Sequence, residues 1–161
     1  MNQRAVAVGV AALALASNIV FQRLLMHSAV PSRVLIPGLA DFHPTWNPGV
    51  SFGLFAQGTA LGRTLLAASL LVLSAVVAVL MWRTTSRLAA IGFALILGGA
   101  LGNLLDRALY DFAVFDFLAL HLGFVPLFVC NLPDIFISAG VVLVALDSLL
   151  EKPNDGSDFA A

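Results

Sequence analysis

Charged residues are scarce in this chain of 161 residues, at 11% of the total against 60% hydrophobic residues. A typical soluble domain carries roughly 25% charged residues, so this composition, with a mean hydropathy of +1.00, excludes an ordinary soluble domain and indicates a membrane protein. The formal net charge of -1 gives no electrostatic basis for binding nucleic acid. The only cysteine, Cys130, excludes an internal disulfide, and no Cys or His spacing resembles a zinc site, so we expect no metal and no cofactor.

Long hydrophobic runs make up most of the sequence. Four of them reach the ~20 residues that a helix needs to cross the hydrocarbon core of a bilayer, and they cover about 5–25, 61–82, 88–109 and 128–150. We predict an all-α membrane protein with one domain over 1–152 and a disordered tail over 153–161. A cleaved signal peptide is an alternative for the first run, but that run is long enough to span the bilayer.

Two longer links, 26–60 and 110–127, lie on one side of the predicted bundle. The first contains VPSRVLIPGLADFHPTWNPGVSFG, whose four prolines argue against a continuous helix, while VLIPGL predicts a short strand. Four spans place both termini on the same side. Positive charges are divided evenly between the two sides, but Arg83 and Arg87 lie in the shortest link, where the positive-inside rule is most reliable. We expect both termini in the cytoplasm.

Two aspartates lie inside the predicted spans at the same membrane face. Asp106 is near the end of the third span and Asp134 near the start of the fourth, so both lie ~5–10 Å inside the helix ends. Asp134 has a simple structural explanation, because Asn131 and Asp134 have the spacing of a helix cap followed by an acid in the first turn. Asp106 is near a helix C-terminus, where the dipole disfavours an anion, so its burial needs a partner or a function.

The spacing also places an asparagine on the helix face of each aspartate, Asn103 with Asp106 and Asn131 with Asp134. Two carboxylates held close together in a low-dielectric site do not both ionise easily, so one keeps its proton while the other takes a proton from water. We therefore predict that Asp106 and Asp134 form an aspartic peptidase dyad. No Ser–His or Ser–Lys pair is placed in the spans, and the histidines lie in the links, where we expect interfacial positions: His27, His43 and His121.

Three ordered blocks of the sequence resemble those of the lipoprotein signal peptidases, also called signal peptidase II. They are NPGVSFG at 47–53, GGALGNLLDR at 98–107, and VFDFL followed by CNLPD, which ends at Asp134. The resemblance implies a bacterial inner-membrane aspartic endopeptidase that removes the signal peptide from prolipoproteins by cutting before a diacylglyceryl-modified cysteine. It also implies a small extracytoplasmic β-element, a short helix over the site, and lipid-modified prolipoproteins and membrane lipids as partners. We expect a monomer.

The same resemblance assigns roles to single residues. Asp106 and Asp134 match the catalytic pair, whereas Asp116 matches an acid for which a structural role is expected. Phe52 and Gly53 complete the first block. Residues that support the site or form the substrate cleft are Asn47, Gly49, Asn103, Arg107 and Asn131.

The chain departs from the family pattern in its first span, where Asn18 and Gln22 stand in place of the usual Asp and Lys. If that pair orients the site, this protein does so with neutral hydrogen bonds or works less well. In the last block Cys130 replaces an aromatic residue and Pro133 a small one, and a proline is tolerated in the first turn of a helix. Two alternatives stay open: a catalytically impaired paralogue that binds lipoproteins, and a small proton-coupled transporter.

Overall fold

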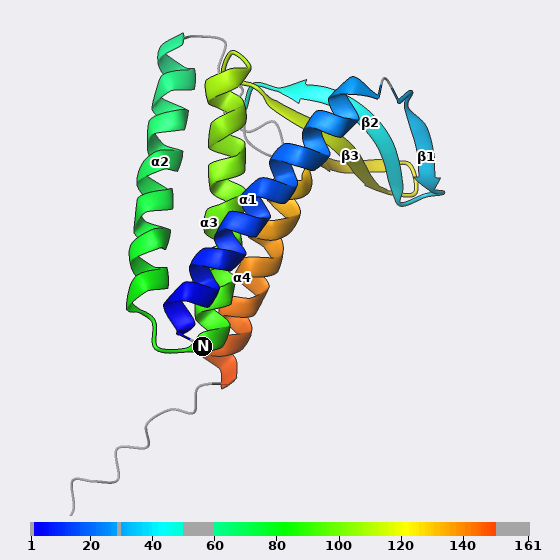
Figure 1. Ribbon diagram of the computed structural model, residues 1–161. Helices are drawn as coiled ribbons and strands as arrows, with labels where there is room; N and C mark the ends of the chain where they lie inside the picture. Colours follow the sequence, from blue (N-terminus) through cyan, green and yellow to red (C-terminus); the bar gives the residue numbers. More distant parts are fainter. Residues whose placement is uncertain (1, 29, 50–59, 151–161) are drawn as a thin grey trace, which may run out of the picture.

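Four long helices form a bundle, and a four-stranded sheet extends from one end of it (Figure 1). The computed structural model describes residues 2–28, 30–49 and 60–150. The helices are α1 (Gln3–His27), α2 (Ala60–Arg83), α3 (Arg87–Leu109) and α4 (Leu132–Leu150). All four are long and apolar enough to cross a membrane. The predicted four-helix membrane fold with a small β-element is confirmed.

The sheet joins the two outer links to each other. Its strands are β1 (Arg33–Ile36), β2 (Ala40–Asn47), β3 (Val114–Leu122) and β4 (Val125–Cys130). They are antiparallel in the order β1-β2-β3-β4, so β2 from the first link pairs with β3 from the second. The predicted strand at VLIPGL is only partly present, because β1 ends at Ile36 and the chain then turns at Gly38, whose φ of +77° favours glycine.

The fourth helix begins later than predicted, at Leu132 rather than at Phe128. Phe128 pairs with Leu120 and Cys130 with Leu118, so the apolar run starts as a strand and continues as a helix. A hydrophobic run alone does not distinguish a buried strand from a helix. No short helix lies between the long ones in the described parts of the outer links, and the predicted tail over 153–161 is outside the described residues.

Helix α3 is central and packs against the other three helices. Small residues let their backbones approach closely: a Cβ added at Gly99 would lie 2.5 Å from the carbonyl oxygen of Pro133 in α4, and one at Gly98 would lie 2.7 Å from that of Ala11 in α1. Such contacts replace the hydrophobic effect as the force between helices in lipid. They fix α3 and α4 side by side at the end where their polar residues lie.

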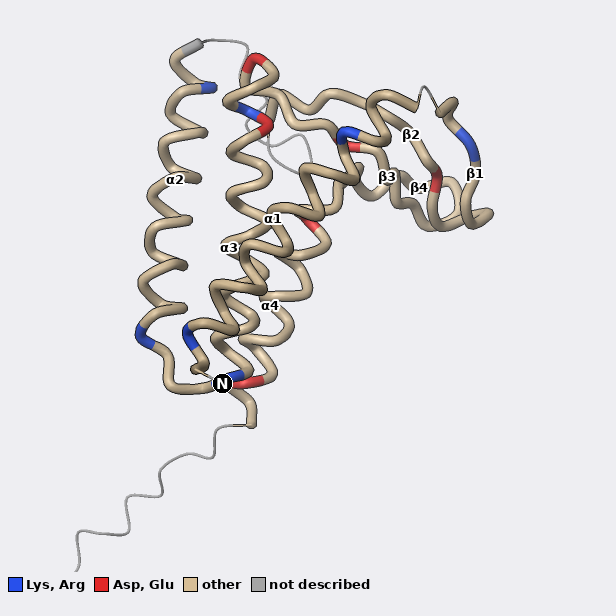
Figure 2. The backbone as a smooth tube through the Cα atoms, in the orientation of Figure 1, with Lys and Arg blue, Asp and Glu red and all other residues tan. Residues whose placement is uncertain are grey.

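An aromatic cluster fixes the sheet to the bundle. Phe42, Phe115 and Phe117 are buried and pack against Leu25 and Met26 at the end of α1. This contact places the beginning of β3 beside the ends of α3 and α4. Charged residues lie in the sheet and near the two ends of the bundle, and the middle of the helices carries none (Figure 2), as expected for segments inside lipid.

Candidate active site

Asn131 and Asp134 form a helix cap at the start of α4. The backbone N–H of Asp134 donates to Asn131 Oδ1 over 3.0 Å, and the backbone N–H of Asn131 donates to Asp134 Oδ2 over 3.3 Å. The side-chain amide of Asn103, on α3, donates to Asp134 Oδ1 over 3.0 Å. These donors and the positive end of the α4 dipole stabilise a charged Asp134 carboxylate.

A second buried carboxylate, that of Asp116 on β3, lies next to this cap. Only 1% of Asp116 is exposed. Its carboxylate accepts hydrogen bonds from the side-chain amides of Asn131 over 2.7 Å and of Asn47 over 2.9 Å. The Asn131 amide also donates to Asn103 Oδ1 over 3.1 Å. Asn131 therefore connects the two carboxylates, bonding Asp116 through its side chain and Asp134 through its backbone.

The environments of these two groups favour different protonation states. The pKa of Asp116 is raised from 3.8 to about 6, chiefly by burial and also by the neighbouring charge of Asp134. The hydrogen bonds from Asn47 and Asn131 act in the opposite direction and lower it. Burial also raises the pKa of the Cys130 thiol to about 11, with the charges of Asp134 and Asp116 acting in the same direction. Cys130 is thus neutral at physiological pH and unsuited to be a nucleophile.

Arg107 connects α3 to the segment that follows β2. Its guanidinium donates to the carbonyl oxygen of Gly49 over 2.5 Å and to that of Asn103 over 3.1 Å. The N–H of Gly49 in turn donates to Asn47 Oδ1 over 2.9 Å, which orients the amide that holds Asp116. The predicted supporting residues thus form one network around the two carboxylates. Phe52 and Gly53, predicted to complete the first block, lie outside the described residues.

Both carboxylates line one cavity of about 370 Å³ between α2, α3 and α4, called the cleft below. Its polar end consists of the network just described, and both Asp116 and Asp134 belong to the lining. The remaining walls are mostly apolar and include Leu73 of α2, Ile96 of α3 and Ile137 of α4. The cleft therefore joins a pair of acids to apolar surface within the spans.

Asp106 occupies a different environment from the one predicted. Its carboxylate accepts a short hydrogen bond from the side-chain amide of Gln22 on α1 and one from the backbone N–H of Phe115 over 3.4 Å. Asp106 is 3% exposed and is not among the described residues that line the cleft. Asn103 does line it, and successive residues of a helix turn by about 100°, which puts Asp106 ~60° from Asn103 around α3.

The structure thus brings Asp134 together with Asn103, Asn131 and Asp116, and turns Asp106 towards α1. Sequence reasoning placed the two acids of the spans at equal depth but did not resolve their rotation about the helix axes. A signal for Asp116 was present in VFDFL: alternate residues of a strand face opposite ways, so Asp116 lies opposite Phe115 and Phe117 and away from the aromatic cluster.

The unusual pair in the first span makes a neutral contact to the site. Gln22 donates to Asp106, and Asn18, one turn earlier, packs so closely on Gly102 that a Cβ there would lie 2.7 Å from its amide nitrogen. Both side chains are buried. Gln22 thus supplies the neutral hydrogen bond that was one of the two outcomes expected for this pair, whereas Asn18 contributes a packing contact.

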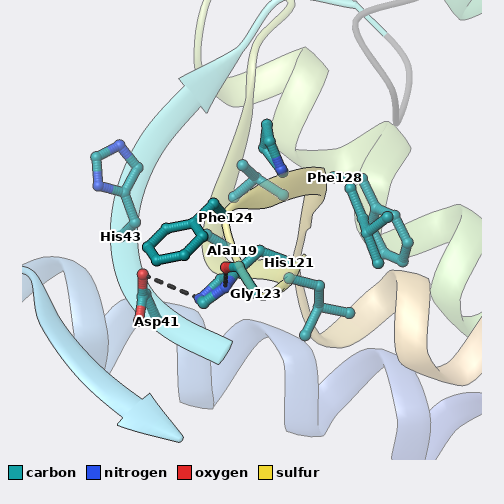
Figure 3. A pocket seen from close by; sticks show the side chains of 11 residues that line it. Asp41, His43, Ala119, His121, Gly123, Phe124 and Phe128 are labelled. Atoms are coloured by element: carbon teal, nitrogen blue, oxygen red, sulfur yellow. Dashed lines mark hydrogen bonds and ion pairs between the residues drawn. The ribbon is translucent and has the colours of Figure 1, made fainter. Parts of the chain in front are cut away.

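A second cavity of about 500 Å³ lies on the sheet, called the sheet cavity below (Figure 3). Among the residues that line this cavity, His121 and Asp41 form a pair in which His121 Nε2 lies 3.2 Å from the Asp41 carboxylate. His43 and Phe124 lie near this pair. Neither Asp116 nor Asp134 is among its described lining residues. Within the described part of the chain, no three Cys, His, Asp or Glu side chains are grouped to hold a metal ion.

Comparisons with known proteins find matches to both the sequence and the fold of this chain. The family model described as Signal peptidase (SPase) II matches residues 6–150. The lipoprotein signal peptidase of Methylorubrum extorquens (strain PA1) is 52% identical over 124 residues, which are 76% of this chain and 71% of the relative. That of Methylobacterium radiotolerans is 52% identical over 76% of this chain and 70% of the relative. A solved bacterial membrane enzyme has the same fold, with a TM-score of 0.78 at 18% identity over 98% of this chain and 95% of the other.

Proposed function

The chain belongs to the signal peptidase II family, and from that premise we propose that Asp116 and Asp134 are its catalytic pair. It is an aspartic endopeptidase that removes the signal peptide from prolipoproteins. The observation that carries the proposal is that these two buried carboxylates share Asn131 at the polar end of one cleft. Asp106, which the sequence suggested as the partner of Asp134, takes a supporting role in this proposal.

The two acids divide the chemistry according to their environments. Asp134, held as an anion by Asn103 and the start of α4, takes a proton from a water molecule. The water oxygen forms a bond to the carbonyl carbon of the scissile peptide, while Asp116, whose raised pKa favours its protonated form, donates its proton to the carbonyl oxygen. As the carbon–nitrogen bond breaks, the proton held by Asp134 passes to the leaving amine and Asp116 regains its own.

Asp106 positions Asp116 without touching the substrate. Its carboxylate holds the N–H of Phe115, the residue that precedes Asp116, and is itself held by Gln22. The hydrogen bonds join α1, α3 and β3 at one buried point. A shift of this point would displace Asp116, and misplacing a catalytic group by about 1 Å costs on the order of 10²-fold in rate.

The substrate reaches this site from the bilayer. The apolar walls of the cleft suit the signal-peptide residues before the scissile bond, and a lipid-modified cysteine keeps that bond close to the headgroups. We place the protein in the bacterial inner membrane, as a monomer, with both termini in the cytoplasm and the sheet outside it. Support for this orientation comes from Arg83 and Arg87, which end α2 and begin α3 and so flank the shortest link. That link lies at the end of the bundle away from the sheet (Figure 1).

The test is cleavage of a synthetic prolipoprotein carrying a diacylglyceryl cysteine by three purified variants. Asp116→Asn and Asp134→Asn each remove a proton-transfer group and lower kcat by about 10³-fold or more. Asp106→Asn keeps an oxygen that accepts from both Gln22 and Phe115, so it retains activity within about tenfold of the wild type. Loss of activity in Asp106→Asn together with an active Asp116→Asn would restore the pairing of Asp106 with Asp134 and overturn the proposal.

A further inference from the structure

We propose that the acyl chains of the modified substrate cysteine lie in a groove between α4 and the sheet, on the other side of Asp134 from the cleft. The inference rests on the proposed function. The groove has a volume of about 570 Å³. Leu120 and Phe128 belong to its sheet wall, Ser138 and Val142 to its α4 wall, and Asp134 lies where the groove begins.

Among the described lining residues, Asp134 is the one that the cleft and the groove share. A peptide bond cleaved at Asp134 has the signal peptide on one side and the modified cysteine on the other, and the two cavities offer separate space for these two parts. The cleft is lined mostly by residues of α2, α3 and α4, and the groove by residues of β3, β4 and α4. The sheet and α2 lie on opposite sides of the bundle (Figure 1). One substrate can therefore occupy both cavities at once.

The position of the sheet indicates which part of the substrate lies in the cleft and which part lies in the groove. The mature chain that follows the cysteine leaves the membrane, and the sheet is the structured part outside the bundle. The sheet cavity shares Leu120 and Phe128 with the groove, so the cleft, the groove and the sheet cavity follow one another in space. This order matches the order of signal peptide, lipid-modified cysteine and mature chain along the substrate.

The depth and chemistry of the groove suit acyl chains. Val142 lies eight positions after Asp134, which corresponds to a rise of ~12 Å along α4, towards the middle of the bilayer. Apart from Asp134, the described residues that line the groove are uncharged. Acyl chains are already in an apolar phase, so their entry gains little hydrophobic free energy. The groove instead restricts where the cysteine lies relative to the two carboxylates, which is a contribution of orientation.

Two adjacent valines of α4 provide a matched pair of variants. Val142 lines the groove and is 56% exposed, whereas Val141 is 52% exposed and is not among the residues that line the groove or the cleft. Val142→Trp fills the groove and Val141→Trp adds the same bulk on a different face of α4. The substrates are one prolipoprotein peptide with either two palmitoyl chains or two hexanoyl chains, which end before they reach Val142.

Val142→Trp should lower kcat/KM for the dipalmitoyl substrate about tenfold or more, a loss of about 1.4 kcal/mol or more of transition-state stabilisation. It should leave kcat/KM for the dihexanoyl substrate within about threefold of the wild type. Val141→Trp should change neither by more than about twofold. Equal effects of both variants, or a loss of activity that is independent of chain length, would refute the proposal that the acyl chains lie in the groove. Cleavage by the wild type would still support the proposed function in that case. A chain-length effect confined to Leu73→Trp would assign the acyl chains to the cleft instead. Failure of the wild type to cleave the dipalmitoyl substrate would overturn both proposals.

Discussion

Replacing Asp116 by asparagine is expected to inactivate the protein and to stabilise it at the same time. The rise of the Asp116 pKa from 3.8 to about 6 means that the folded protein resists ionisation of this group. At ~1.36 kcal/mol per pKa unit, keeping the charged carboxylate buried at pH 8 costs about 3 kcal/mol of folding stability. The substituted side chain would carry no charge, but its amide cannot accept from both Asn47 and Asn131, which offsets about 1 kcal/mol of the gain.

The sign of the pH dependence follows from the direction of the shift. A carboxyl group whose pKa is raised on folding stabilises the native state below the unfolded pKa of 3.8, and this contribution is lost as pH rises through about 6. The stability of Asp116→Asn relative to the wild type should therefore increase by about 2.5 kcal/mol between pH 4 and pH 8. By the scaling for domains of this size, that is a change of about 5–10 °C in the difference between the two Tm values.

The assay is thermal unfolding in detergent micelles at a series of pH values, followed by tryptophan fluorescence. Trp46 is a suitable reporter, because its ring centroid lies 5.0 Å from that of Tyr110 and 5.4 Å from that of Phe115, close to the site. Asp111→Asn is the matched control, since the Asp111 side chain is 90% exposed and its removal should leave the pH profile unchanged. Parallel profiles of wild type and Asp116→Asn from pH 4 to pH 8 would refute the reasoning.

Three further predictions concern the reaction and the packing. If Asp116 is the protonated member of the pair, kcat/KM falls as pH rises above about 6, approaching tenfold per pH unit, and a rate that rises over this range would contradict that assignment. Gln22→Ala leaves the buried carboxylate of Asp106 without its side-chain donor, so the free energy of unfolding measured in detergent should fall by about 1–3 kcal/mol. An unchanged free energy of unfolding would show that the hydrogen bond is dispensable. Gly99→Ala places a Cβ 2.5 Å from a backbone oxygen and should lower Tm. The control Gly9→Ala, whose added Cβ has nothing within 4 Å, should raise stability by about 0.5–1 kcal/mol. Similar effects of the two substitutions on Tm would contradict close packing of α3 on α4.

The neutral residues of the first span bear on how such a site is held together. Gln22 meets the carboxylate of Asp106 with an amide, so the buried contact forms without bringing a second charge out of water. Desolvating a full ion pair can cost more than the attraction between its members returns. A neutral donor at this position is thus compatible with a rigid site. The activity of the wild type on a lipidated substrate distinguishes this view from an impaired paralogue.

The number of long helices and one half of the candidate site could be predicted from the sequence. Four apolar runs of sufficient length determined the helices, because a backbone in lipid must satisfy its hydrogen bonds within each segment. The cap formed by Asn131 and Asp134 was also predictable, since it depends on neighbours three residues apart. The boundary between β4 and α4 was not, because the apolar run from Phe128 onward continues through both elements.

The partner of Asp134 depended on tertiary structure. Asp106 and Asp134 are both close to one membrane face, and helical spacing predicts that depth, but it leaves open how α3 is rotated when it packs. That rotation follows from the backbone contacts of Gly98 with α1 and Gly99 with α4, and it turns Asp106 to Gln22. Asp116 arrives from a strand whose position depends on pairing with β2, a distant segment of the chain. Local sequence determines which residues lie on the same face of a helix or strand. Only long-range packing determines which other element that face contacts.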